Sequence, residues 1–220
     1  MNMNAAATRR SPALPRTMRG FTLVEMLVVL GIIGILSAIV VGAVSQVGPK
    51  KMISVTKAKR FELATFIELY KTDLGSYPRD NPANPGTNTL FYELTGVLFT
   101  NNLVTPANAT FTSPLDSTNN LTSAQLNAVF GTVGIQNVAR PGSRPKSYIK
   151  NPVEGHDYRP VRVGVNTVML LTPPPAAQKN PAATVTWNYD ASSNRRRNMA
   201  GFDLWVELVV KGTTNRYGNW

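Results

Sequence analysis

Apolar residues are concentrated in one block near the N-terminus. Met26 to Val44 form a run with no charged side chain and a single hydroxyl, that of Ser37. As an α-helix, such a run extends roughly 29 Å, close to the thickness of the hydrocarbon core of a bilayer, about 30 Å. No face of this helix is polar, and a helix satisfies its own backbone hydrogen bonds in lipid. The pattern predicts a membrane-inserting helix and not the core helix of a globular domain.

A different pattern follows this block. Apolar residues now recur three or four positions apart, with charged residues between them, as on a helix with one buried face. They are Leu63, Phe66, Ile67, Tyr70 and Leu74. We expect the helix to continue over residues 49–75 as an amphipathic segment, and Gly75 to end it.

Short elements are predicted after residue 76. Residues 90–103 favour a short helix, and the capping-box pair Thr122 and Gln125 predicts the start of a second one. Residues 79–90, 105–120 and 139–160 are rich in Pro, Asn, Thr and Ser, which is typical of loops.

The C-terminal third has the alternation of β-strands. Apolar and polar residues alternate over 161–165, which runs into the apolar residues 168–171, and again over 202–210; residues 184–189 are also β-prone. We expect three or four antiparallel strands that cover the helix. The predicted fold class is α+β, a long N-terminal helix (one half membrane-inserted, the other amphipathic) packed against a small antiparallel β-sheet.

Composition narrows the possible functions. The 220 residues suffice for one ordinary domain with appendages. Lys and Arg number 23 against 12 Asp and Glu, which permits anionic partners such as lipid headgroups or nucleic acid and also an ordinary basic surface. Arg9, Arg10, Arg16 and Arg19 precede residue 21 without an acid among them. The chain has no cysteine, which excludes disulfides, cysteine-ligated zinc and thiol catalysis.

The apolar block has three explanations. It is longer than the apolar part of a cleaved secretory signal, although Val41-Gly42-Ala43 would serve as a cleavage site. A plain signal anchor is the second explanation. Neither accounts for Glu25, because a carboxylate at the centre of a membrane helix costs about 2.5–3.5 kcal/mol, less near its end, and usually has a partner.

The residues around Glu25 supply the third explanation. Arg19-Gly20-Phe21-Thr22-Leu23-Val24-Glu25-Met26-Leu27 resembles the prepilin signature of type IV pilins and type II secretion pseudopilins. In that signature a basic leader ends in glycine, and Phe-Thr-Leu-[Ile/Val]-Glu and an apolar helix follow. The resemblance covers about the first fifty residues.

The resemblance implies a sequence of processing and assembly. Prepilin peptidase would cut after Gly20 and methylate the new amine of Phe21. The carboxylate of Glu25 would then meet the amine of a neighbouring pilin subunit, identical or related, on an inner-membrane assembly platform. Gly34, Ala38 and Gly42 form a small-residue stripe that lets helices approach closely in lipid.

The resemblance also implies a domain organisation with a pilin-like fold. Residues 1–20 would be a cytoplasmic leader, 21–48 a single transmembrane helix in the bacterial inner membrane, 49–75 its amphipathic continuation, and 76–220 a periplasmic head, the whole extractable into a filament. Charge does not decide the orientation, because the four leader arginines face five basic residues on the other flank of the helix.

Two C-terminal features resemble the major pseudopilin. They are Gly75-Ser76-Tyr77-Pro78 at the expected helix end and Gly218-Asn219-Trp220. That family often has an acidic calcium-binding loop near its end, where this chain has Arg195-Arg196-Arg197. Because calcium requires six to eight oxygen ligands, usually with several carboxylates, we expect no calcium site and no other metal or cofactor.

Two other classes of function were weighed. His156, Asp157 and Glu154 lack an accompanying nucleophile motif, so we do not expect an enzyme. Arg195, Arg196 and Arg197 lie near Trp187 and Tyr189, a combination that could contact phosphates and stack on bases. The leading hypothesis is a structural subunit of a type II secretion pseudopilus or type IV pilus-like filament; the alternative is a minor or competence-type pilin that binds DNA.

Overall fold

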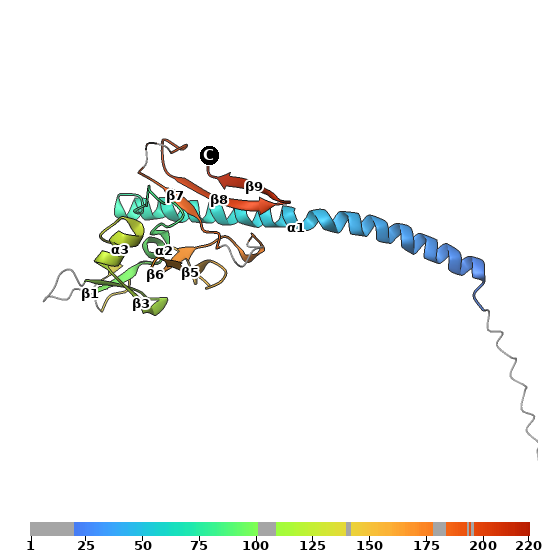
Figure 1. The fold of residues 1–220 in the computed structure, drawn as a ribbon, viewed down its shortest axis with the longest axis horizontal. Coiled ribbons are helices and arrows are strands. Elements are labelled where there is room, and N and C mark those ends of the chain that lie inside the picture. Colours follow the sequence, from blue (N-terminus) through green and yellow to red (C-terminus); the bar gives the residue numbers. More distant parts are fainter. Residues whose placement is uncertain (1–19, 101–108, 140–141, 178–183, 193, 195) are drawn as a thin grey trace, which may run out of the picture. The chain divides into compact units, whose positions relative to one another are not determined.

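The computed structural model describes residues 20–100, 109–139, 142–177, 184–192, 194 and 196–220. Of residues 41–47, 116–119 and 176 it describes the backbone alone. The chain divides into two units between Gln46 and Val47. Helix α1 (Leu23–Leu74) begins in the first unit and ends in the second (Figure 1).

The first unit contains the apolar part of α1. The segment Leu23–Val40 has a mean hydropathy of 2.7, and none of it is buried. In the described part of the chain this is the one helix long and apolar enough to cross a membrane. The predicted apolar N-terminal helix is therefore confirmed.

The second unit is a globular head that packs on the remainder of α1. One face of the helix is buried through Met52, Leu63, Ile67 and Tyr70. Gly75 ends the helix as predicted: its φ is +78°, and its N–H donates to the Lys71 carbonyl at 2.8 Å. The side chain at position 74, expected on the buried face, is 43% exposed because the helix ends there.

A four-stranded sheet follows α1 in sequence. Helix α2 (Leu90–Thr95) is fully buried and leads into β1 (Val97–Thr100). Strand β2 (Thr110–Ser113) pairs antiparallel with β1, and β3 (Asp116–Thr122) pairs antiparallel with β2. Strand β4 (Val138–Ala139) pairs parallel with β1, giving the order β3-β2-β1-β4. Helix α3 (Ser123–Phe130) has the predicted capping box of Thr122 and Gln125.

The predictions for this region were partly wrong. The helix expected over 90–103 stops at Thr95, and the loop expected over 105–120 contains β2 and most of β3. In the β2–β3 hairpin Phe111 and Leu121 pair with each other and are buried, while Thr and Asn occupy the neighbouring positions. Their loop-like composition concealed the alternation.

Two further sheets complete the head. Strands β5 (Tyr158–Val163) and β6 (Asn166–Leu171) form a hairpin, and η2 (Pro175–Ala177) follows. Strands β7 (Asn188–Asp190), β8 (Asp203–Val210) and β9 (Thr213–Gly218) form an antiparallel sheet. In Figure 1, β8 and β9 lie on one side of the head part of α1 and β5 and β6 on the other.

In the C-terminal third the predicted strands are present, but several of their predicted bounds are wrong. Strand β8 buries Leu204, Val206 and Leu208 by the predicted alternation. The single run expected over 161–171 is a hairpin that turns at Gly164, where φ is +61°, and β5 begins inside the loop expected over 139–160. Strand β7 covers only the end of the β-prone run 184–189. The α+β class is confirmed, with several small sheets in place of one.

A buried carboxylate connects three segments of the head. Glu93 on α2 is fully buried and accepts hydrogen bonds from the Tyr70 hydroxyl at 2.6 Å and from the backbone N–H groups of Gln136 and Asn137, each at 3.1 Å. The Asn137 side-chain amide donates in turn to the carbonyls of Glu93 and Lys146, both at 2.7 Å. Burial raises the pKa of Glu93, and these donors oppose that shift only in part.

The Glu93 network gives a stability prediction. In Glu93→Gln an amide N–H₂ replaces one oxygen that accepts a buried donor, so at about pH 5 we expect the free energy of unfolding to fall by about 1–3 kcal/mol. Because burial raises the folded pKa, the contribution of Glu93 is full below its ordinary pKa of 4.5 and is lost as the pH rises through the folded value. The difference between the two proteins should therefore narrow as the pH rises. Chemical denaturation of the full chain in detergent micelles measures it.

The exposed Glu154 offers a matched control for that measurement. Glu154→Gln should change the free energy of unfolding by less than about 0.5 kcal/mol. Equal stabilities of the wild type and Glu93→Gln across this pH range would contradict our account of the network.

Candidate functional site

The predicted processing residues lie at the start of α1. Gly20 and Phe21 precede the helix and are exposed, Phe21 to 74%. Thr22 and Glu25 form a capping box: the Thr22 N–H donates to the Glu25 carboxylate at 2.9 Å, and the Glu25 N–H donates to the Thr22 hydroxyl oxygen at 3.2 Å. Within the chain the Glu25 carboxylate therefore caps its own helix. Our sequence analysis missed this pair, although its Thr-x-x-Glu spacing is visible in the sequence.

The described part of the small-residue stripe is exposed. Gly34 and Ala38 lie on α1 and are exposed, and a Cβ added to Gly34 would meet nothing within 4 Å. Gly42 lies in the same helix. The packing role of these three residues stays a prediction, because it requires a second helix.

A loop between β7 and β8 holds the described part of the arginine cluster. The Arg196 guanidinium donates to the Ala191 carbonyl at 2.7 Å and also to the Gly201 carbonyl. These carbonyls lie at the two ends of the loop, so one side-chain cation joins them. Arg195 lies outside the described residues.

Two carboxylates fix the backbone of the same loop. Asp203 accepts from the N–H groups of Arg197 and Asn198 at 2.7 and 2.8 Å. Asp80 accepts from the N–H groups of Ala191 and Ser192 at 2.7 and 2.8 Å. Each carboxylate thus accepts hydrogen bonds from backbone N–H groups that would otherwise bond to water.

Residues 218–220 fasten the loop from the side of β9. The Asn219 side chain accepts from the Leu204 N–H and donates to the Phe202 carbonyl, both at 2.8 Å. The Trp220 ring folds back over Gly218, where an added Cβ would lie 2.5 Å from the ring. The Arg197 guanidinium lies 4.7 Å from the centroid of the Trp220 ring, which packs 5.8 Å from Trp205. These contacts give a physical reason for a Gly-Asn-Trp sequence at this place.

The aromatic residues expected beside the arginines do not serve that role. Trp187 and Tyr189 are buried, 1% and 0% exposed, so their rings are not available for the base stacking that the DNA-binding alternative would require. Both side chains belong to the buried hydrophobic core of the head. Arg196 donates to carbonyls at both ends of the loop, and Arg197 lies against Trp220.

The histidine cluster forms a structural ion pair. The Lys59 ammonium lies 2.8 Å from Asp157 and 3.0 Å from Glu62, fixing α1 to the turn before β5. Burial acts to raise the pKa of Asp157, but Lys59 and the Val153 N–H outweigh it and lower that pKa. His156 is exposed, and its Nδ1 lies 3.4 Å from the Asp157 oxygen that Lys59 contacts. Among the described residues, no group of three or more His, Asp or Glu side chains could hold a metal ion.

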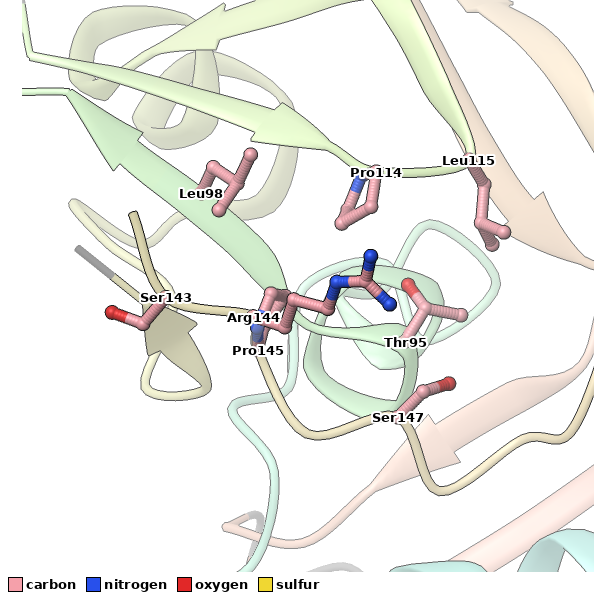
Figure 2. A pocket seen from close by; sticks show the side chains of 8 residues that line it. All are labelled: Thr95, Leu98, Pro114, Leu115, Ser143, Arg144, Pro145 and Ser147. Carbon is pink, nitrogen blue, oxygen red and sulfur yellow. The ribbon is translucent and has the colours of Figure 1, made fainter. Parts of the chain in front are cut away.

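A pocket of about 430 Å³ lies between β1, the β2–β3 turn and the segment 143–147 (Figure 2). Its walls include Leu98, Pro114 and Leu115, and Thr95 and Ser147 add hydroxyl groups. Figure 2 shows the Arg144 side chain crossing the pocket, with its guanidinium between Pro114 and Thr95. Our sequence analysis missed this pocket because a loop, a strand end and a hairpin turn far apart in sequence create it.

Comparison with protein-family models supports the N-terminal interpretation. The prokaryotic N-terminal methylation motif matches residues 15–41. This motif is the prepilin-type signature of type IV pilins and pseudopilins, so the resemblance found in the sequence is confirmed. Searches of curated proteins and of solved structures found no match. The motif and the apolar helix together support a pilin-like, membrane-anchored, single-pass protein of a structural type.

The contacts of Arg196 predict that its removal destabilises the β7–β8 loop. Arg196→Met keeps an unbranched side chain and removes the donors to both carbonyls, so we expect the free energy of unfolding to fall by about 1.5–3 kcal/mol. The amides of residues 191–202 should exchange their hydrogens faster, as measured by mass spectrometry on the full chain. Arg162→Met is the matched control, because Arg162 donates to the Gly164 carbonyl within its own hairpin turn. Unchanged exchange in Arg196→Met would show that the cation does not hold the loop.

Proposed function

We propose that the chain is a filament subunit that prepilin peptidase cuts after Gly20 and methylates on Phe21. The apolar part of α1, which follows Phe21, anchors it in the inner membrane as a single-pass protein, with the leader cytoplasmic and the head periplasmic. Assembly on an inner-membrane platform with identical or related subunits then moves this helix from lipid into a filament. The observation that carries the proposal is the coincidence of the methylation motif at 15–41 with the apolar segment Leu23–Val40 of α1, none of which is buried within the described chain.

The exposed apolar segment Leu23–Val40 is consistent with both proposed states of the subunit, in the membrane and in the filament. Its side chains gain nothing from water, and within the described chain no other element covers them. Lipid covers them before assembly, and helices of neighbouring subunits cover them afterwards. The small-residue stripe of Gly34, Ala38 and Gly42 favours close packing of such helices.

Glu25 supports assembly through charge. Its capping box satisfies the start of the helix, yet a carboxylate there retains a negative charge that no cation of the described chain offsets. The amine that cleavage creates on a neighbouring Phe21 supplies the opposite charge. In a medium of low polarity that pairing stabilises the contact and fixes the register of the two subunits.

The C-terminal contacts favour a pseudopilus over other pilus-like filaments. Gly218-Asn219-Trp220 packs back onto the β7–β8 loop, and this packing supports the resemblance to the major pseudopilin. The DNA-binding alternative gains no such support, because the aromatic residues that it required are buried.

The mature N-terminus tests the proposal directly. Mass spectrometry of the chain from native cells should find a peptide that begins at Phe21 and carries one added methyl group on its amine. Cleavage after Ala43 would instead indicate a secretory signal, and an intact leader would indicate a plain anchor. Either result would contradict the proposal.

Substitution of Glu25 tests the assembly step separately. Glu25→Gln keeps an oxygen for the capping box and removes the charge, so we expect normal cleavage and a loss of most incorporation into sheared filaments. Thr22→Ala is the matched control, because it weakens the capping box and keeps the charge, and it should still incorporate. Normal incorporation of Glu25→Gln would contradict a role for the charge.

A further inference from the structure

The positive charge of the head is concentrated at the point where the head begins. Residues 47–61 hold five basic side chains and no acidic one. Residues 62–220 hold 14 basic and 11 acidic side chains, so this first short segment carries more net charge than all the rest of the head. An imbalance confined to one place indicates a surface for an anionic partner.

Three of the five basic side chains are available to such a partner. Lys50, Lys51 and Lys57 are exposed and take part in no ion pair among the described side chains. The ammonium group of Lys57 lies 6.0 Å from the centroid of the Tyr217 ring, at the limit of a cation–π contact. Lys59, by contrast, is held in the structural ion pair described above.

The turn between β8 and β9 adds another exposed base to this end of the head. Lys211 lies in that turn and follows Val210, which packs against the same hydrophobic core as Met52 of α1. Figure 1 shows the turn beside the first part of the head segment of α1. Val209, two residues before Lys211, is 60% exposed, and exposed apolar side chains among lysines are typical of surfaces that meet lipid headgroups. We call Lys50, Lys51 and Lys211 the basic collar.

The spacing along α1 brings the collar to the polar layer of a membrane. Lys50 follows Val44, the last residue of the apolar run, by six residues, a rise of about 9 Å. The polar layer of each leaflet extends about 5–7 Å beyond the hydrocarbon. Because side chains on a helix lean toward its N-terminus, the ammonium groups of Lys50 and Lys51 reach back toward the phosphates. Lys57 lies about 10 Å farther along the helix, about one screening length in 0.1 M salt.

A second copy of the head is a poorer source of negative charge for the collar. The partly exposed carboxylates Glu62, Asp73 and Glu207 are each paired with a base of the same head. The phosphates of a bilayer are present at the end of the apolar run whenever that run spans a membrane. Nucleic acid offers the same phosphate chemistry, but it has to compete with a bilayer that the chain itself holds at a high local concentration.

We propose that the basic collar binds the phosphate groups of anionic phospholipids in the leaflet that faces the head. This inference rests on the membrane location in the proposed function, and it names the partner of the head before assembly. The contact holds the head at a fixed distance from the bilayer while the apolar segment lies in lipid. It is broken when the helix leaves lipid for the filament, so anionic lipid opposes extraction of the subunit.

A fluorophore at the base of the collar tests the contact in the full chain. Gly48 is exposed, a Cβ added there would meet nothing within 4 Å, and the chain has no cysteine, so Gly48→Cys introduces a single thiol for the label. The labelled chain is reconstituted into phosphatidylcholine vesicles. These contain a small fraction of phosphatidylglycerol or phosphatidylcholine with a nitroxide quencher at the upper end of one acyl chain. Quenching requires close approach, so it reports lipid at the collar and not at the leader arginines across the bilayer.

The expected result is a preference for the anionic quencher. We expect phosphatidylglycerol to be enriched at the label about fivefold or more over phosphatidylcholine, the factor that corresponds to one lysine at an anionic surface. Sodium chloride at 1 M should abolish the enrichment, because it shortens the screening length to about 3 Å. Lys50→Gln, Lys51→Gln and Lys211→Gln together should reduce the enrichment to less than about twofold, whereas Lys57→Gln alone should have a smaller effect.

A matched variant removes the same charge from the other end of α1. Arg144, Lys146 and Lys150 are exposed, and Lys146 pairs with Asp73, about 35 Å along the helix from Lys50. Changing these three bases to Gln should leave the enrichment unchanged. Because both triple variants lose three positive charges, a difference between them does not arise from net charge.

The outcomes separate this inference from the proposed function. Equal quenching by the two lipids in the otherwise unsubstituted chain would overturn the contact, and so would equal losses in the two triple variants. A preference abolished by a short DNA duplex at constant ionic strength would assign the collar to nucleic acid and overturn the lipid contact. None of these results touches the filament proposal. An intact leader in native cells would remove that proposal and leave the lipid contact standing.

Discussion

The structure depends on one helix that has to be stable in two different surroundings. Over Leu23–Val40 helix α1 is apolar on every side, and from Met52 onward it buries only one face. The first pattern suits a solvent without hydrogen bonds, and the second suits an element that packs on a head in water. The change of pattern along a continuous helix determines which part of the chain can be anchored and which part can carry a folded domain.

The head is held together by burial on α1 and by charged groups that organise the backbone. Glu93 joins α1, α2 and the segment before β4, and Asp80 and Asp203 do the same for the β7–β8 loop. Three small sheets need such connections, because each alone buries too little apolar surface to be stable. Acidic residues are scarce in this basic chain, and several of those it has are engaged in this way.

Sequence patterns predicted the parts of the fold that rest on local rules. The apolar run, the amphipathic face, the Gly75 stop, the capping box of α3 and the alternation of β8 each follow from spacing within a few residues. Strands β2 and β3 were missed because Thr and Asn dominate them and only Phe111 and Leu121 report burial. The Arg144 pocket and the burial of Trp187 depend on contacts between distant segments, which no local pattern encodes. At the N-terminus the motif predicted the processing residues. The capping box of Thr22 and Glu25 could also have been predicted from its Thr-x-x-Glu spacing, but it was not.

The guanidinium of Arg196 is tied by covalent bonds to the loop that it organises. A dissolved ion in the same position would leave at a rate set by its affinity and would be lost whenever its free concentration fell. A side chain has a fixed, high local concentration and cannot be removed by dilution. Order in the β7–β8 loop, and with it the attachment of Trp220, is therefore fixed by the polypeptide itself and does not require an ion from the surrounding solution.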